Sequence, residues 1–170
     1  MKKLLPPLLA LLLFCLALPC ASAADVTPSP QKLSVDGTDA DCDKYNIDGS
    51  NYFKLRDLAY LLSKSDSRFS VAFDAESNAV TVVPGGDYVP VGGELERGKD
   101  LSKTAVASKQ SVLINGEAVE GISVYNIGGN NYFKLRDLGS ALGFTVAFDA
   151  DANTAVVLSK GSKATYQNAF

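Results

Sequence analysis

Two copies of one short string carry the charged and aromatic side chains best suited to bind a ligand. Asn-Tyr-Phe-Lys-Leu-Arg-Asp-Leu occupies residues 51–58 and again residues 131–138. Guanidinium groups bind carboxylates through paired hydrogen bonds, and tyrosine rings can stack on sugars. An anionic wall polymer or the carboxylate of a partner would suit these cations. The candidate ligand-binding residues are therefore Tyr52, Lys54 and Arg56 in the first copy, with Tyr132, Lys134 and Arg136 in the second.

The same residues also have a structural interpretation, which the duplication favours. A string kept in both copies of a repeat serves the folding of the repeated unit, and charged residues at helix starts usually fix geometry. On this interpretation Arg56 and Arg136 form bidentate ties to nearby acids such as Asp74 and Asp149, or to loop carbonyls. One aromatic residue of each Tyr-Phe pair then lies in the core.

Catalytic and metal-binding chemistry has little support in the composition. The chain has no histidine, whereas copper(II) sites need imidazole nitrogens and many nucleophile–base pairs need histidine. Gly85-Gly86 and Gly92-Gly93 lack the spacing and the Lys-Ser/Thr of a phosphate-binding loop. We therefore predict no enzyme, no cofactor and no metal site. The catalytic alternative is a small hydrolase that uses paired carboxylates, such as Asp57 with Asp74, although no motif recommends that pair.

Two acidic segments partly match a calcium-binding loop. Residues 39–43 read Asp-x-Asp-x-Asp, but Lys44 stands where the loop needs glycine and Ser50 where it needs glutamate. Residues 149–153 fail at the same two places. Solvated turns are the favoured interpretation. A calcium-dependent carbohydrate-binding module remains an open alternative.

The first 23 residues predict a secretory signal peptide. Lys2 and Lys3 precede apolar residues 8–18, and Ala-Ser-Ala at 21–23 is a cleavage pattern. The apolar run is too short to span a bilayer, and no later segment reaches the ~20 residues required. Removal of the two lysines changes the net charge from −3 to −5, which argues against nucleic acid as a partner. Cys42 is then the only cysteine, so an intramolecular disulfide is not expected.

Both copies predict the same series of elements. Each begins with a hairpin whose turn, Asp36-Gly37 or Asn115-Gly116, suits a type I′ conformation. A second hairpin follows over residues 45–53 and 125–133. Leucines spaced three and four apart then predict a helix of about ten residues, which begins near Lys54 or Lys134. Gly143 is placed to end the second helix.

A closing hairpin completes each copy. Residues 69–73 and 144–148 alternate strictly, which predicts half-buried strands with Phe, Val and Phe on the core face. Residues 79–83 and 154–158 form the last strands. The predicted fold is therefore α+β, with two repeats, each an antiparallel sheet of about five strands curled around one short helix.

The domain boundaries follow from these elements and from composition. We predict a signal peptide at 1–23, a spacer at 24–31, repeat 1 at 32–83, a linker at 84–110, repeat 2 at 111–158 and a tail at 159–170. Apolar content drops over the linker. A structureless segment of that length is uncommon inside a compact domain. The two repeats are therefore expected to be separate or loosely coupled units.

These motifs together resemble one known family. The Asn-Gly hairpin, Tyr-Asn-Ile-x-Gly, the repeated string and Phe-x-Val-x-Phe-Asp, over residues 31–83 and 110–158, are similar to the copper amine oxidase N-terminal-like domain, also called a stalk domain. That module recurs in exported proteins of Gram-positive bacteria, and in the family it is a five-stranded antiparallel sheet curled around one helix. The family name does not bring copper chemistry to this chain.

The resemblance implies a secreted, non-catalytic module of the cell envelope that acts as a spacer, an adhesion unit or a ligand-binding unit. A cell-wall glycan or another envelope protein is the expected partner, and no membrane span is expected in the mature chain. The alternative function is a carbohydrate- or peptidoglycan-binding module, either calcium-dependent or calcium-independent.

Overall fold

The computed structural model describes residues 24–164. The predicted signal peptide and the last six residues of the predicted tail lie outside this range. The predicted spacer contains β1 (Val26–Pro28), and the first repeat contains β2 (Lys32–Val35), β3 (Thr38–Ala40), β4 (Lys44–Ile47), β5 (Ser50–Lys54), α1 (Leu55–Leu61), β6 (Phe69–Asp74) and β7 (Ala79–Pro84). The predicted linker contains the 3₁₀ helix η1 (Ser102–Thr104) and β8 (Val106–Ala107), and the second repeat contains β9 (Ser111–Ile114), β10 (Glu117–Ala118), β11 (Val124–Ile127), β12 (Asn130–Lys134), α2 (Leu135–Leu142), β13 (Thr145–Asp149) and β14 (Thr154–Leu158).

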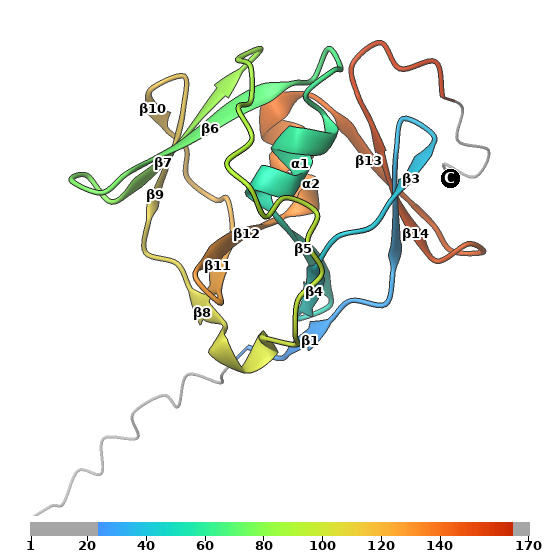
Figure 1. Ribbon diagram of the computed structural model, residues 1–170, viewed down its shortest axis with the longest axis horizontal. Helices are drawn as coiled ribbons and strands as arrows, with labels where there is room; N and C mark the ends of the chain where they lie inside the picture. Colours follow the sequence, from blue (N-terminus) through green and yellow to red (C-terminus); the bar gives the residue numbers. More distant parts are fainter. Residues whose placement is uncertain (1–23, 165–170) are drawn as a thin grey trace, which may run out of the picture.

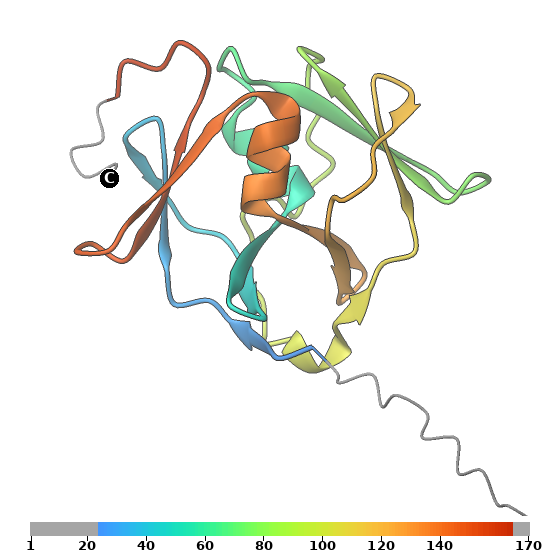
Figure 2. The same ribbon diagram turned by 180° about the vertical axis from the view of Figure 1, so that it is seen from behind.

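A six-stranded sheet joins the two repeats through their repeated strings. Its strand order is β1-β4-β5-β12-β11-β8. β5 and β12 pair antiparallel at the centre, with Phe53 directly opposite Phe133. Equivalent strands of the two repeats therefore lie at equal distances from this central pair. The arrangement has approximate two-fold symmetry, with α1 and α2 side by side above the sheet (Figure 1, Figure 2).

Two four-stranded sheets each combine strands from both repeats. Their strand orders are β10-β9-β7-β6 and β13-β14-β2-β3. The first hairpin of each repeat lies beside the closing hairpin of the other, through the parallel pairs β7–β9 and β14–β2. The remaining strand pairs of the described residues are antiparallel. Figures 1 and 2 show these two sheets on either side of the helices.

This exchange corrects the predicted arrangement of one antiparallel sheet per repeat. The coarser prediction is confirmed, because the chain is α+β, mostly sheet, with two helices among the described residues. The prediction of a separate sheet for each repeat is wrong, because the first hairpin of each repeat pairs with the closing hairpin of the other repeat. The exchange places β9 along the edge of β7 and β2 along the edge of β14, so the N–H and C=O groups on these two edges are paired.

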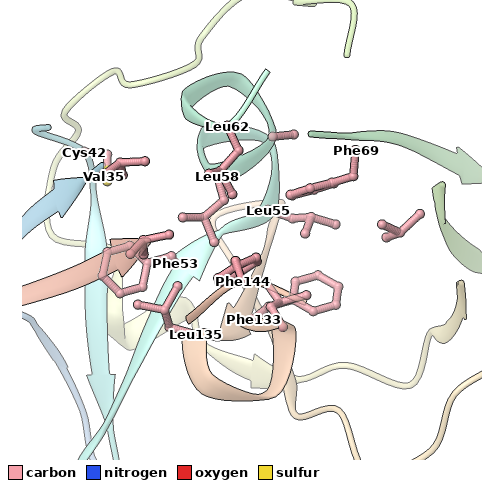
Figure 3. Packing of buried hydrophobic residues seen from close by; sticks show 14 of the residues in the cluster. Val35, Cys42, Phe53, Leu55, Leu58, Leu62, Phe69, Phe133, Leu135 and Phe144 are labelled. Carbon is pink, nitrogen blue, oxygen red and sulfur yellow. The ribbon is translucent and has the colours of Figure 1, made fainter. Parts of the chain in front are cut away.

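The larger of two hydrophobic clusters among the described residues combines side chains from both helices and all three sheets. Phe53, Leu55 and Leu58 from the first repeat pack with Phe133 and Leu135 from the second (Figure 3). All five are almost fully buried. Because both repeats supply this core, the prediction of separate or loosely coupled units is wrong. A helix of seven or eight residues is unstable alone, and the shared core supplies the packing that each helix lacks.

Local elements follow the sequence closely. Asp36, Gly37, Asn115 and Gly116 all have positive φ, as a type I′ turn requires. Gly143 ends α2 in the left-handed conformation, with φ of 79°. The helices are shorter than the ten residues predicted, with seven in α1 and eight in α2. Neither described helix has the length or the apolar character to cross a membrane.

The closing strands differ from prediction at their second phenylalanine. Phe69 and Phe144 are buried in the core as expected. Phe73 is instead 55% exposed and Phe148 is 39% exposed. Both lie near the outer ends of β6 and β13, beyond the part of each strand that meets the helices. The β6–β7 hairpin thus projects from the core in Figure 1, which leaves an aromatic ring at the surface.

Candidate functional site

Two clefts of similar size form at equivalent places in the two halves of the molecule. The first has a volume of about 420 Å³ and is lined by Lys54, Arg56 and Phe73 with Gln110, Asn130 and Asn131. The second has a volume of about 400 Å³ and is lined by Lys134, Arg136 and Phe148 with Gln31, Ser50 and Asn51. These sets occupy the same positions of the two repeats. The hairpin exchange therefore builds the same cleft twice.

Each cleft is made by both repeats. One repeat supplies the start of its helix and the outer end of its closing hairpin. The other supplies the turn between its second pair of strands and the glutamine that precedes its first hairpin. Neither cleft would exist in an isolated repeat with its own separate sheet.

The exposed phenylalanines give each cleft an apolar wall. Phe73 pairs across the hairpin with Val80, and Phe148 pairs with Ala155. Val80 and Ala155 also line the respective clefts. A solvent-exposed aromatic face beside an apolar strand offers a surface on which a ring-shaped ligand can stack.

Side-chain amides line each cleft together with the phenylalanine. Asn131 Nδ2 donates to Gln110 Oε1 at 2.6 Å, and Asn51 Nδ2 donates to Gln31 Oε1 in the same way. This bond fixes the orientation of each glutamine amide. Because each glutamine accepts through Oε1, its Nε2 group is the part of the amide that can donate to a ligand.

Arg56 and Arg136 line the two clefts and are exposed. The ion pairs within residues 24–164 involve neither arginine. The predicted ties to Asp74 and Asp149 are therefore wrong. Asp74 instead accepts from Ser77 Oγ at 2.6 Å and from the Glu76 N–H at 2.9 Å, within its own turn, and these bonds lower the pKa of Asp74. Asp149 likewise accepts from the Ala152 N–H at 2.9 Å.

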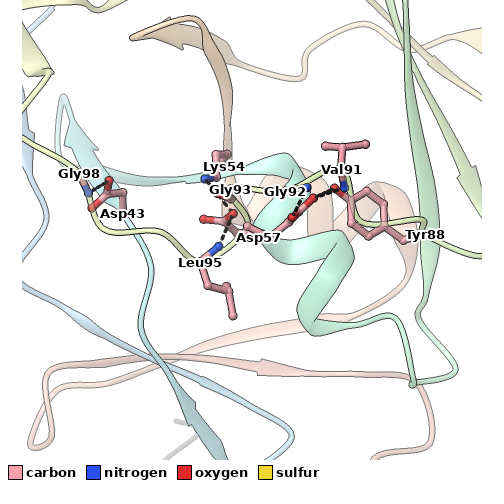
Figure 4. Close-up of polar contacts among 10 residues, drawn as sticks. Asp43, Lys54, Asp57, Tyr88, Val91, Gly92, Gly93, Leu95 and Gly98 are labelled. Carbon is pink, nitrogen blue, oxygen red and sulfur yellow. Dashed lines mark hydrogen bonds and ion pairs between the residues drawn. The ribbon is translucent and has the colours of Figure 1, made fainter.

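The two candidate lysines have different surroundings. Lys54 is buried, with its Nζ 3.1 Å from Asp57 Oδ1 and 2.7 Å from the carbonyl oxygen of Gly93 (Figure 4). The Leu95 N–H also donates to Asp57 Oδ1, at 3.1 Å. Lys134, at the equivalent position, is half-buried and forms none of the described ion pairs. Lys54 is thus a structural residue, and Lys134 is accessible from its cleft.

Asp57 is fully buried beneath the segment that contains Gly93 and Leu95. Burial raises the pKa of Asp57, although the bonds from Leu95 and Lys54 oppose this effect. Its second oxygen, Oδ2, has no hydrogen-bond partner among the described residues. Asp74 is exposed and bonded within its own turn. The geometry therefore does not favour Asp57 and Asp74 as a hydrolytic pair, since Asp57 does not line either cleft.

The candidate tyrosines belong to a second hydrophobic cluster, which also contains Tyr45, Ile47 and Ile127. Tyr52 is buried, and its hydroxyl is 2.7 Å from Ser123 Oγ of the other repeat. Tyr132 is buried edge-on against Tyr45, with ring centroids 5.1 Å apart. Burial raises the pKa of Tyr132. Neither tyrosine lines the two equivalent clefts, although Tyr132 lines a cavity of about 240 Å³.

Part of the predicted linker is an ordered strap, residues 88–98, held against the first repeat (Figure 4). Glu94 accepts from the Tyr88 hydroxyl at 2.6 Å and from the N–H groups of Val91 and Gly92 at 2.9 and 3.0 Å. The Tyr88 bond is the main cause of a Glu94 pKa lowered to about 2. Tyr88 and Val91 add an apolar edge to the first cleft. The second cleft has no such edge among its described lining residues.

The acids of the first calcium-like segment contact the strap. Asp41 Oδ2 is 2.8 Å from Arg97 Nη1, and Asp43 accepts from the Gly98 N–H at 2.6 Å. Within residues 24–164, no three His, Cys, Asp or Glu side chains are grouped so that they could hold a metal ion. Cys42, which lies between these two aspartates in the sequence, is buried. Burial raises the pKa of its thiol to about 12.

Comparison with protein-family models, with curated proteins and with solved structures found no match. The candidate site therefore rests on its own geometry. Of the six predicted residues, Arg56, Arg136, Lys54 and Lys134 line the clefts, whereas the tyrosines do not. Sequence reasoning missed the phenylalanines and the amides. One available signal was that a glutamine precedes the first strand in both copies.

Proposed function

We propose that this chain is a secreted, non-catalytic module of the cell envelope, resembling the stalk domain family, and that it binds a glycan chain in its two equivalent clefts. The observation that carries the proposal is the repetition of one set of groups at both clefts. Each has an exposed phenylalanine, an oriented glutamine amide and an arginine without an ion pair among the described residues. A polymer of repeating units matches a protein that repeats its site.

The chemistry of these groups suits sugars. The phenylalanine face can stack on the C–H face of a sugar ring, and the amides can donate to and accept from hydroxyl groups. Volumes near 400 Å³ fall at the lower end of the roughly 300–1,000 Å³ typical of small-molecule sites. Two sites on one polymer also raise the overall affinity, because the second contact is intramolecular.

Co-sedimentation with purified cell-wall material tests the proposal. Phe73→Ala and Phe148→Ala should each weaken binding, and the double variant should abolish it. Both rings are exposed, so the melting temperature should stay close to that of the parent. Val89→Ala is the matched control, because Val89 is 74% exposed and lies outside both clefts. If the double variant sediments as well as the parent does, the clefts are not the binding sites and the proposal fails.

A further inference from the structure

The two clefts share their shape but differ in their available charge. Identical strings place a lysine and an arginine two residues apart at each helix start. In the first cleft, Asp57 and the Gly93 carbonyl hold Lys54, so Arg56 is the only accessible cation of the pair. In the second cleft, Lys134 and Arg136 both line the cavity.

No acid compensates these two cations within the second cleft. Its described lining contains amides, one hydroxyl, apolar groups and glycine, but no carboxylate. Asp137, the counterpart of Asp57, accepts from the Ser123 N–H at 3.2 Å and forms none of the described ion pairs with Lys134. Two positive charges in one concave site favour an anionic ligand group.

We infer that the second cleft binds a sugar that carries a carboxylate, and that Arg136 and Lys134 are its specificity-determining residues. This inference rests on the proposed glycan-binding function and adds the ligand class. The planar guanidinium of Arg136 can hold a carboxylate through two parallel hydrogen bonds. Lys134 adds a second positive charge. The Phe148 side chain offers an aromatic surface to the sugar ring.

The position of the aromatic ring favours a carboxylate over a phosphodiester. A carboxylate attached to a sugar ring can reach the two cations while that ring lies on Phe148, because all three residues line one cavity of about 400 Å³. A phosphodiester lies between successive units of a polymer, and so lies further from the stacked ring. The first cleft, with one accessible cation and the apolar edge from Tyr88 and Val91, should discriminate less by charge.

Calorimetric titration of the mature protein with matched ligands tests this inference. The ligands are an oligogalacturonate and its methyl ester, which have the same sugar rings with and without charge. The parent should bind the acid about tenfold more tightly than the ester, since a hydrogen-bonded charge contributes on this scale. Added salt should weaken binding of the acid more than that of the ester.

Substitutions in the two clefts distinguish the second from the first. Arg136→Ala should lower the affinity for the acid far more than the affinity for the ester, so that the preference is lost, and Arg136→Lys should restore part of it. Arg56→Ala is the matched control and should retain the preference. Equal affinity for acid and ester, an unaffected Arg136→Ala variant, or tighter binding of a phosphate-bearing oligosaccharide would each overturn the inference. These results would leave the wall-binding role of the two phenylalanines intact, since the sedimentation assay tests that separately.

Discussion

Leu138→Ala tests whether the two repeats share one cooperative core. Leu138 is fully buried in the cluster that contains Phe53 and Leu58 of the first repeat. Truncation of a buried leucine removes transfer free energy and leaves a cavity, at a cost of ~2–5 kcal/mol. A shift of roughly 3 °C per kcal/mol applies to a chain of this size, so the melting temperature should fall by roughly 6–15 °C.

Scanning calorimetry and hydrogen exchange provide the two measurements. The shared core predicts a single transition in the parent and in the variant. It also predicts that β7 and β14, which belong to different repeats, lose protection together. Leu58→Ala is the matched variant on α1 and should lower the same single transition by a similar amount. Two separate transitions, with only residues 111–158 affected by Leu138→Ala, would refute the shared core.

Two further predictions concern the strap and the contact between repeats. Glu94 has a pKa of about 2 in the folded chain, below its ordinary 4.5, so its carboxylate stabilises the fold above about pH 5 and this contribution is lost as the pH falls toward about 2. Thermal melts should therefore give a higher melting temperature for the parent than for Glu94→Gln at neutral pH, and this difference should shrink as the pH is lowered. A difference in melting temperature that stays constant between pH 6 and pH 3 would contradict this prediction. Tyr52→Phe should cost ~1 kcal/mol through the lost bond to Ser123 Oγ. A double-mutant cycle with Ser123→Ala measures that coupling, and a value near zero would show that the hydroxyl pair contributes nothing.

Features set by local backbone chemistry could be predicted from the sequence. Asp36-Gly37 and Asn115-Gly116 specify turns with positive φ, and Gly143 ends α2 because glycine tolerates the left-handed conformation. The hairpins and helix starts follow from the spacing of apolar residues. None of these depends on which strand lies alongside.

Strand partners could not be predicted, because the duplicated sequences are ambiguous. The pattern of β9 is the same whether it pairs within its own repeat or with β7, since alternation reports only the buried face. The exchange follows from a shared core, which is a property of the whole chain. The exposure of Phe73 and Phe148 could not be predicted either. Alternation shows which side chains share a face of the strand, but it does not show how far the core extends along that face.

The sequence predicted part of the candidate site, because the repeated string contains its cations, but an identical string cannot show how the two copies differ. The positions of Arg56 and Arg136 in the repeated string indicated accessible cations, and both line clefts. The identical string could not distinguish Lys54 from Lys134. Their difference comes from the strap, since Gly93 and Leu95 cover the first lysine and its aspartate.

Side-chain amide signals provide the most direct test of ligand binding in both clefts. The measurement is a nitrogen–proton NMR titration of the chain from residue 24 onward with a soluble glycan fragment released from cell-wall material. The account predicts that the NH₂ signals of Gln31 and Asn51 shift, together with those of Gln110 and Asn131, since each pair lines one cleft. Shifts confined to residues outside both clefts, with these four amides unchanged at saturation, would contradict it.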